Sequence, residues 1–237
     1  MTAAFPLEVV DEAGSTSDVL KARADAGAGE AALLARRQTA GHGRLGRPWR
    51  SIDGNLHLSV LLRPGSLPWP GHWSLLAAVA LAGAVQADLP DGLALRLKWP
   101  NDLLLDGGKL AGVLLEAGGM ADPWLVIGFG VNLAGAPDGL GRPVACLADA
   151  GVAPDPEGFA RRLLTGLQAW RAAYQRDGFA PVRAAWLRLG PRMGDVLSVS
   201  SGAAVTSGSF RGLGDDGALL LDGADGPVTI VAGEVGE

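Results

Sequence analysis

The chain has 237 residues, a hydrophobic content of 48% and a formal net charge of −5 at pH 7. This length suits one main domain with a small second one, and the acidic balance argues against a general nucleic-acid-binding surface. Its one cysteine, Cys146, excludes a disulfide framework and a cysteine-based zinc site, and indicates a reducing compartment, the cytoplasm.

The first predicted helix lies in the sequence STSDVLKARADAG. Hydroxyl residues at its start can cap a helix, and Gly27 is a natural C-terminal residue. A short apolar strand is expected over residues 31–36. A second strand is expected over residues 55–62, where apolar and β-branched residues run up to Pro64.

Between these strands lies GHGRLG, residues 41–46, which matches the G-x-G-x-x-G pattern of dinucleotide-binding sites. In such sites the glycines lead directly into a helix whose N-terminal N–H groups bind the pyrophosphate. Here Pro48 and an Asp53-Gly54 turn follow, a strand comes next, and no acidic residue stands at the ribose position about 20 residues on. We therefore reject a dinucleotide site and expect a loop between two strands.

The same loop concentrates positive charge, because residues 36–50 hold five arginines, three glycines and Trp49. Glycines let backbone N–H groups approach an anion, arginine side chains match phosphate oxygens, and an aromatic ring can stack on a base. The stretch predicts a site for a nucleoside triphosphate or an acyl phosphate. A solvated basic loop is the alternative, and a single-stranded nucleic-acid site is disfavoured by the single aromatic ring. No P-loop motif occurs.

Residues 73–88 are almost continuously apolar and predict a buried helix that ends before Pro90. The apolar run is too short to cross a bilayer and is interrupted by Gly83. The N-terminal residues lack the basic and apolar regions of a signal peptide. We expect a soluble protein that makes no membrane contact.

The stretch ALRLKWPNDLLLDGGKLAGVLLE predicts a strand that stops at Pro100 and then a hairpin around an Asp-Gly-Gly turn, and WLVIGFGVNL predicts another buried strand. Sequential hairpins indicate a mixed or antiparallel sheet. Two of the chain's three lysines, Lys98 and Lys109, fall here, although arginine is used elsewhere. A compact ammonium that arginine cannot replace is one explanation.

Three features of this region are candidates for ligand contacts. Lys109 could stabilise negative charge on a carboxylate and a phosphate, or it could simply extend to water from a strand end. Asn101 and Asp102 form either a plain turn or a pair that orients a ribose or phosphate. Asn132 follows two glycines of an apolar strand, whose missing side chains would leave room for a ligand.

The C-terminal third has a different pattern of apolar residues and glycines. An amphipathic helix is expected from Pro156 to near Gly178, and a second helical stretch over residues 180–189. Short strands with glycine turns then fill about 45 residues, which predicts a small β-barrel. We therefore divide the chain into a ligand-binding domain, residues 1–190, and a small C-terminal domain, residues 191–237.

Four segments in this order, STSD, RRQTAGHGRLGRPWRS, KWPNDLLLDGGKLAGVLLE and GFGVNL, together resemble the biotin–protein ligases. The resemblance covers most of the chain. It implies an α+β fold: a mixed β-sheet catalytic core with flanking helices, like that of class II aminoacyl-tRNA synthetases and biotin synthetase, plus a small C-terminal SH3-like β-barrel.

The activity that the resemblance implies has two steps. The enzyme joins biotin to ATP, in the presence of Mg²⁺, to give biotinyl-5′-AMP and pyrophosphate. It then transfers biotin to one lysine of the biotin carboxyl-carrier domain of acetyl-CoA carboxylase or of another biotin-dependent carboxylase. The resemblance also allows a homodimer, because family members often pair through sheet edges.

The resemblance further implies roles for individual residues. Lys109 matches the catalytic lysine, assisted by Arg44. His42 and Ser17 stand where the family usually has Arg and Asn. The residues implied for biotin are Ser15, Thr16, Ser17, Gln38, Gly41, His42, Gly43, Arg44, Lys109 and Gly112. Those implied for ATP and the adenylate are Arg44, Arg47, Trp49, Lys98, Asn101, Asp102, Lys109 and Asn132. No protein ligand for a metal is assigned.

Two other functions are compatible with parts of this pattern. A lipoate or octanoate ligase of related fold would need a longer apolar tunnel in place of the hydroxyl cluster. A non-catalytic biotin or nucleotide sensor would not need Lys109. The STSD segment begins at Ser15, so we expect no N-terminal winged-helix domain and no sequence-specific DNA binding.

Overall fold

The computed structural model describes residues 5–65, 69–139 and 141–236, and it contains two sheets. The larger sheet has seven strands in the order β1-β2-β3-β7-β6-β5-β4. These strands are β1 (Leu7–Ala13), β2 (Ala31–Gln38), β3 (Leu56–Leu62), β4 (Leu95–Lys98), β5 (Asp102–Leu105), β6 (Gly108–Gly118) and β7 (Trp124–Val131).

The larger sheet is mixed, as the sequence predicted. Strands β1 and β2 run parallel, and the five other neighbouring pairs run antiparallel. The expected hairpin is present between β5 and β6, and its turn residues Asp106 and Gly107 both have positive φ angles, 46° and 83°. Glycine adopts this region without steric cost, and aspartate tolerates it better than most residues.

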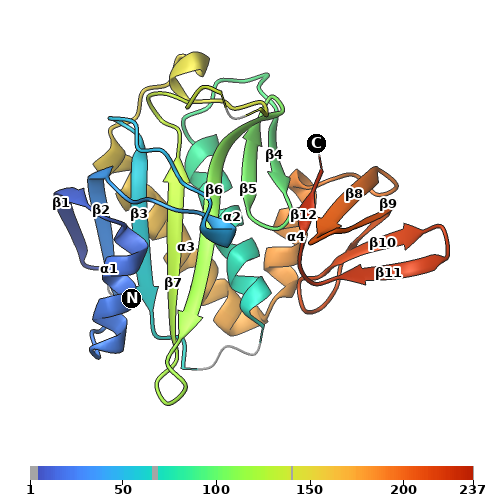
Figure 1. The fold of residues 1–237 in the computed structure, drawn as a ribbon, viewed down its shortest axis with the longest axis horizontal. Coiled ribbons are helices and arrows are strands. Elements are labelled where there is room, and N and C mark those ends of the chain that lie inside the picture. Colours follow the sequence, from blue (N-terminus) through green and yellow to red (C-terminus); the bar gives the residue numbers. More distant parts are fainter. Residues whose placement is uncertain (1–4, 66–68, 140, 237) are drawn as a thin grey trace.

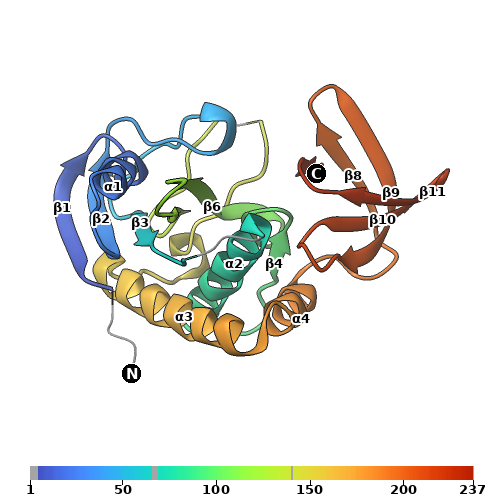
Figure 2. The ribbon, with the colours of Figure 1, turned by 90° about the horizontal axis from the view of Figure 1, so that it is seen from below.

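Helices cover both faces of the larger sheet, as Figure 2 shows: α1 lies on one side and α2 and α3 on the other, and α4 packs against α2, α3 and β4 near the C-terminal strands. They are α1 (Thr16–Asp25), α2 (Pro70–Gln86), α3 (Pro156–Asp177) and α4 (Ala180–Leu189). Two short 3-10 turns span Arg44–Gly46 and Ala148–Ala150. Helix α2 begins at Pro70, three residues earlier than the apolar pattern suggested, because proline is favoured in the first helical turn.

Each face of the sheet has its own apolar core. Helix α1 buries Leu20 and Ala24 against alternate residues of β2, β3 and β7, including Leu61. The neighbouring residues of β3 point the other way, toward the large core around α2 and α3. This alternation places Ser59, two residues before Leu61, on the α1 face. At the start of α1, Ser15 Oγ accepts a hydrogen bond from Asp18 N at 3.3 Å, so the hydroxyl cap is confirmed.

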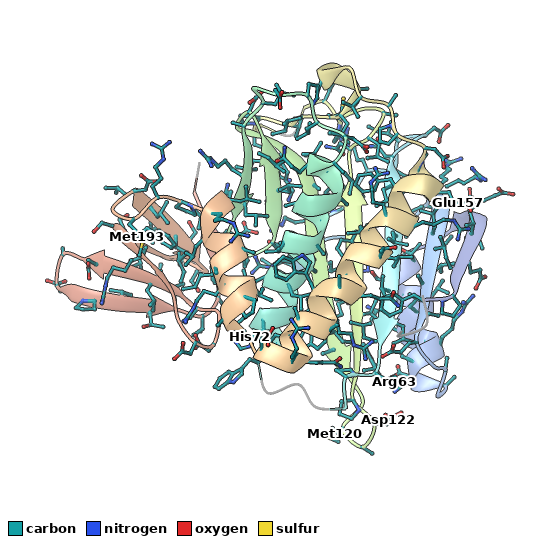
Figure 3. The ribbon with its side chains drawn as sticks, turned by 180° about the vertical axis from the view of Figure 1, so that it is seen from behind. Arg63, His72, Met120, Asp122, Glu157 and Met193 are labelled. Carbon is teal, nitrogen blue, oxygen red and sulfur yellow. The ribbon has the colours of Figure 1, made fainter. Side chains whose placement is uncertain are left out.

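Arg63 joins three elements at one end of the sheet. Its guanidinium contacts Asp122 Oδ2 at 2.8 Å in the β6–β7 turn and donates to the backbone carbonyl of Ala24 at 2.6 Å near the end of α1. Figure 3 shows Arg63 and Asp122 close together beside the exposed tip at Met120. This end of the sheet is therefore held by side-chain contacts to backbone carbonyls as well as by strand pairing.

The five remaining strands form a separate antiparallel sheet, named here the C-terminal sheet, with the order β11-β10-β9-β8-β12. Figure 1 shows β12 on the side of this sheet that lies nearest the larger sheet. The strands are β8 (Val196–Ser201), β9 (Ala204–Leu213), β10 (Leu219–Gly223), β11 (Gly226–Ile230) and β12 (Glu234–Val235).

The closed barrel expected from the sequence is not seen. Within residues 191–236 the outer strands β11 and β12 do not pair with each other, and the two-residue β12 pairs only with β8. A strand this short covers little of the sheet edge and reaches toward the larger sheet instead. The SH3-like barrel therefore stays a prediction, while a separate β unit at the C-terminus is confirmed.

Polar contacts seat the C-terminal sheet against the rest of the chain. His72, near the start of α2 and labelled in Figure 3, has Nε2 2.7 Å from the carbonyl oxygen of Asp215, and its ring stacks on Phe179. The indole N–H of Trp99 donates to the carbonyl of Gly217 at 3.2 Å. The β9–β10 turn is thus bonded to the segment that carries the KWPND motif.

No helix in the described part of the chain combines the length and the apolar character that a membrane span requires.

Candidate active site

A pocket lies on the α1 face of the larger sheet. Its walls come from the start of α1, strands β3, β6 and β7, the β4–β5 turn, the loop over residues 39–55, and strand β12 of the C-terminal sheet. The lining residues are Ser15, Thr16, Ser17, Gln38, His42, Gly43, Arg44, Arg47, Pro48, Trp49, Leu58, Ser59, Lys98, Trp99, Pro100, Asn101, Asp102, Lys109, Gly112, Val113, Leu114, Gly128, Phe129, Gly130, Arg142, Glu234 and Val235.

One wall of the pocket is a buried cluster of hydroxyl and amide groups. The Oε1 atom of Gln38 accepts from Thr16 N at 2.7 Å and from Thr16 Oγ1 at 3.0 Å. Ser59 Oγ lies 2.7 Å from Thr16 Oγ1 and 3.0 Å from Ser17 Oγ. Three buried hydroxyls and an amide therefore face one another, and hydroxyls can turn from donor to acceptor to match a polar ligand.

Two glycines give this cluster its space. A Cβ atom on Gly128 would stand 2.8 Å from Ser17 Oγ. A Cβ atom on Gly41 would stand 2.7 Å from Gln38 Nε2 and 3.0 Å from the carbonyl oxygen of Trp49. A side chain at either position would force a neighbour to move: the Ser17 hydroxyl at Gly128 and the Gln38 amide at Gly41.

A second set of polar contacts holds Gln38 from behind. Ser51 Oγ accepts from Gln38 N at 3.0 Å and lies 2.7 Å from Nε2 of His57. His57 on β3 is 1% exposed, and burial lowers the pKa of its imidazole to about 4. The ring is therefore uncharged at neutral pH and supports the loop as a neutral hydrogen-bonding group.

The glycine loop is closed into a small hairpin. Trp49 N donates to the carbonyl of Gly41 at 2.9 Å, and Gly43 N donates to the carbonyl of Arg47 at 2.7 Å. Leu45, at the tip, has a φ angle of 57° and is 88% exposed. The loop thus stands over the pocket, and the glycine pattern serves this hairpin and not the start of a long helix.

Two arginines of the loop reach the C-terminal sheet. Arg44 Nη1 donates to the carbonyl of Gly233 at 3.2 Å and to Asn101 Oδ1 at 3.4 Å. Arg47 forms an ion pair with Glu234 of β12, whose pKa is lowered chiefly by the hydrogen bonds from Arg47. Residues from the two sheets therefore meet at the mouth of the pocket.

His42 ties the loop to α1. Its Nε2 atom lies 3.2 Å from Asp18 Oδ1, and Lys21 bridges Asp18 at 2.8 Å and Glu116 at 2.6 Å. Burial disfavours the charged form of Asp18, but the hydrogen bonds from Lys21 and His42 outweigh it and lower the pKa of this carboxyl. The contact links the loop, α1 and β6.

Lys109 projects into the pocket because of a β-bulge. The register between β5 and β6 shifts after Leu103, so that Lys109 opposes Leu104 and shares a face with Asp102. Without the shift a lysine at this position would point to the opposite face. Its Nζ atom lies 2.6 Å from Asp102 Oδ1, and the two side chains are 14% and 17% exposed.

Two features of the surroundings of Lys109 act on its charge in opposite directions. Burial lowers the pKa of the ammonium, and Asp102 opposes that shift. Gly112 lies beside the pair, where a Cβ atom would be 3.4 Å from Lys109 Nζ. The Trp49 ring centroid is 5.9 Å from the same nitrogen, within reach of a cation–π contact.

Trp49 is held flat against β7. A Cβ atom on Gly130 would stand 2.4 Å from its ring, so glycine is needed there. The Nε1 donor of Trp49 is buried and has no hydrogen-bond partner among the described residues. Buried donors are rarely left unpaired, so this N–H is available to an acceptor that enters the pocket.

Asn132 and Gly41 are the two predicted site residues that do not line the pocket. The side chain of Asn132 is buried and donates to the backbone carbonyls of Lys109 at 3.3 Å and Ala145 at 3.0 Å. It thereby holds the backbone that carries Lys109. The other predicted residues are brought together in one pocket.

Several lining residues were not singled out from the sequence. Ser59 had a readable signal, because it is a polar residue inside the apolar strand LHLSVLL. Arg142 and Glu234 had no such signal in the sequence. They lie in a loop and in a two-residue strand, both far from the motifs. Among the described lining residues, the cations Arg44, Arg47, Lys98, Lys109 and Arg142 face two carboxylates, Asp102 and Glu234.

Comparison with known proteins adds to this geometry. Residues 14–132 match the biotin/lipoate A/B protein ligase family, and residues 199–235 match the biotin protein ligase C terminal domain. The biotin–[acetyl-CoA-carboxylase] ligase of Paracoccus denitrificans is 42% identical over 216 residues, which cover 87% of this chain and 90% of that protein. The enzyme of the same name from Mycobacterium tuberculosis is 39% identical over 241 residues, covering 97% and 88%.

A solved structure shares the fold over nearly the whole chain. The biotin protein ligase from Aquifex aeolicus, in complex with biotin and ATP, superposes with a TM-score of 0.84 at 26% identity. The match covers 98% of this chain and 97% of that one, and it therefore includes the C-terminal sheet as well as the larger sheet.

Proposed function

The chain belongs to the biotin/lipoate A/B protein ligase family, and on that premise we propose that it is an ATP-dependent biotin–protein ligase. It activates biotin with ATP and transfers it to a lysine of a carrier protein. The observation that carries this proposal is one pocket lined both by a buried hydroxyl cluster and by five cationic side chains, one of which is Lys109.

The hydroxyl cluster suits the ureido ring of biotin. That ring is neutral, with two N–H donors and one carbonyl acceptor, and it requires a few well-placed partners in an otherwise apolar slot. Thr16, Ser17, Ser59 and Gln38 supply hydroxyl and amide groups, and Leu114, beside Gly128, supplies apolar surface nearby. Gly128 leaves room for the ring beside Ser17.

Lys109 suits the reacting centre. In the first step an oxygen of the biotin carboxylate attacks the α-phosphorus of ATP, the new O–P bond forms, and pyrophosphate leaves. Negative charge gathers on the phosphate oxygens in the transition state, where a buried ammonium is most effective. Arg44, held by Asn101 and the Gly233 carbonyl, provides a second positive charge from the loop.

The nucleotide is assigned to the cationic side. Arg47 and Lys98 are suited to the phosphates and Trp49 to the base or ribose, and Asn132 acts through the backbone of Lys109. Magnesium ordinarily binds through phosphates and one or two carboxylates and keeps several waters. Glu234, beside Arg47, fits that requirement and would help a magnesium ion to neutralise phosphate charge.

The partner proposed is a biotin carboxyl-carrier domain, such as that of acetyl-CoA carboxylase. The two-unit division at residue 190 and a cytoplasmic location are part of the same proposal. The lipoate or octanoate alternative is disfavoured by the polar groups that occupy one wall of the pocket, because a long alkyl chain offers them no hydrogen-bonding partner, whereas the ureido ring of biotin does.

The reaction can be tested by mass spectrometry of the purified protein incubated with Mg²⁺, ATP and biotin, then with an apo carrier domain. Biotinyl-AMP followed by a carrier heavier by one biotin on a single lysine is expected. Parallel tubes with lipoate and octanoate test the rival ligases. Bound biotin with no adenylate from any acid would instead identify a sensor.

A further inference from the structure

The transfer step poses a charge problem in this pocket. The acceptor lysine of a carrier has an ordinary pKa of about 10.4, so it arrives as an ammonium that has no lone pair for attack. Five cationic side chains line the pocket, and they repel a sixth. A group that attracts the ammonium and takes its proton is therefore needed at the reacting centre.

Two carboxylates line the described part of the pocket, and they differ in position. Glu234 comes from the C-terminal sheet and is already engaged by Arg47. Asp102 lies beside Lys109, with Oδ1 2.6 Å from the Lys109 nitrogen. Only Asp102 is therefore adjacent to the group assigned to the carboxyl–phosphate junction, where the acyl carbon of the adenylate must lie.

In the ion pair between Asp102 and Lys109, another cation can take the place of Lys109. Asp102 Oδ1 is close to the ammonium, but it makes no hydrogen bond of regular geometry. The absent side chain at Gly112 leaves the space next to both groups open, since a Cβ atom there would be 3.6 Å from Asp102 Oδ1. When Lys109 turns to the adenylate, Asp102 loses its nearest cation, at 2.6 Å, and can pair with another.

We propose that Asp102 is a second catalytic residue, which accepts the proton of the carrier lysine during transfer. The inference rests on the proposed ligase function. The carrier ammonium pairs with Asp102, as Lys109 did before ligand binding, and gives it one proton. The amine nitrogen then attacks the acyl carbon, the C–N bond forms, and the bond from that carbon to the phosphate oxygen breaks. AMP leaves with the bonding electrons, and the second amine proton passes to solvent.

Three other charged side chains lie around Asp102. Lys109 faces it from β6, Lys98 is its register partner on β4, and Arg47 acts on it from the loop. All three are cations, so a carrier ammonium that pairs with Asp102 must take the place of Lys109 beside it. Because a protein carboxylate takes the proton, we expect wild-type transfer to depend little on pH near neutrality.

The test isolates transfer from activation. Enzyme in excess is mixed with purified biotinyl-AMP, and the acceptor is either the apo carrier domain or hydroxylamine, an amine that is uncharged at neutral pH and needs no base. For Asp102→Asn we expect transfer to the carrier to fall on the order of 10²- to 10³-fold, the range for loss of a general base. Capture by hydroxylamine, corrected for the enzyme-free rate, is expected to fall far less than transfer to the carrier, because this acceptor needs no base.

A pH profile gives a second readout that a structural role would not produce. Without Asp102 the amine must be deprotonated by solvent, so the variant's transfer rate rises about tenfold per pH unit from about pH 7 to about pH 9. Asp102→Glu keeps a carboxylate and should recover part of the rate with a flatter profile. Asp138→Asn, which removes a carboxylate outside the pocket lining, serves as the matched control.

Three outcomes would overturn the proposal. Equal loss with carrier and with hydroxylamine would make Asp102 a positioning residue for Lys109. A wild-type rate that itself rises tenfold per pH unit would show that no protein base operates. Unchanged carrier transfer in Asp102→Asn would remove the role altogether. Failure of the wild-type enzyme to transfer biotin at all would instead count against the ligase function.

Discussion

Arg47 in the glycine loop and Glu234 in β12 lie 187 positions apart in the sequence and form an ion pair at the mouth of the pocket. The side chains are half exposed, so the pair contributes only about 0.2–1 kcal/mol to folding stability. The main effect of the pair is on position: Glu234, from the C-terminal sheet, holds Arg47 where it can bind phosphate.

We therefore expect Glu234→Gln to raise the KM for ATP several-fold while the KM for biotin stays near wild type. The glutamine keeps the shape but loses the charge that orients Arg47. Steady-state pyrophosphate release at varied ATP and at varied biotin measures both constants. An unchanged KM for ATP would show that Arg47 is positioned without its partner.

Lys109→Arg tests the catalytic lysine. The guanidinium is broader than an ammonium and cannot occupy the same point beside Asp102. We expect adenylate formation to slow about a hundredfold, which corresponds to about 3 kcal/mol of transition-state stabilisation. Single-turnover pyrophosphate release measures the rate, and calorimetry checks that biotin still binds. A wild-type rate would contradict the role given to Lys109.

Gly128→Ala tests the hydroxyl cluster as the biotin site. The added methyl group would stand 2.8 Å from Ser17 Oγ and must displace it, so we expect biotin affinity to fall about tenfold or more, a cost of about 1.4 kcal/mol. Affinity for a non-hydrolysable ATP analogue should change little. Calorimetry with each ligand separates the two.

Gly83→Ala is the matched control for that substitution. Gly83 lies in α2, where an added Cβ atom meets nothing within 4 Å. Alanine stabilises a helix interior relative to glycine by about 0.5–1 kcal/mol. Equal loss of biotin binding in both variants would mean that the loss in Gly128→Ala does not come from the contact with Ser17.

Features that depend on residues close together in the sequence could be predicted, and features that depend on contacts between distant residues could not. The helix at Ser15 and the β5–β6 hairpin were predictable because capping hydroxyls and Asp-Gly turns act within a few residues. The direction of Lys109 was not, because it depends on a bulge that appears only when β5 and β6 pair. Lys109 as the catalytic residue came from the resemblance and not from spacing.

The sequence did not predict that the C-terminal sheet contributes Glu234 to the pocket, for a similar reason. Short alternating strands indicate a β unit, but they do not determine whether its edges close. The placement of Glu234 against Arg47 depends on how that unit packs against α2, α4 and Trp99. Such contacts join surfaces far apart in the chain, and no local pattern records them.

His57 provides a prediction about pH and stability. The unfolded chain takes up a proton on His57 near the ordinary pKa of about 6.5, whereas in the folded protein burial holds that pKa at about 4. Between these values the unfolded state binds more protons. The free energy of unfolding therefore falls as the pH decreases through this window, by up to about 3 kcal/mol, and is fully present above it.

Urea denaturation at several pH values between about 7.5 and 4.5, a range chosen to span this window, measures the effect, with His57→Gln for comparison. Glutamine cannot be protonated but can still bond to Ser51, so the variant should lose most of the slope. His72 is a second buried imidazole with a lowered pKa, also caused mainly by burial, and it leaves a residual slope of the same sign. If His57→Gln and the wild type lose stability in parallel, then another group, and not His57, controls the acid sensitivity of the fold.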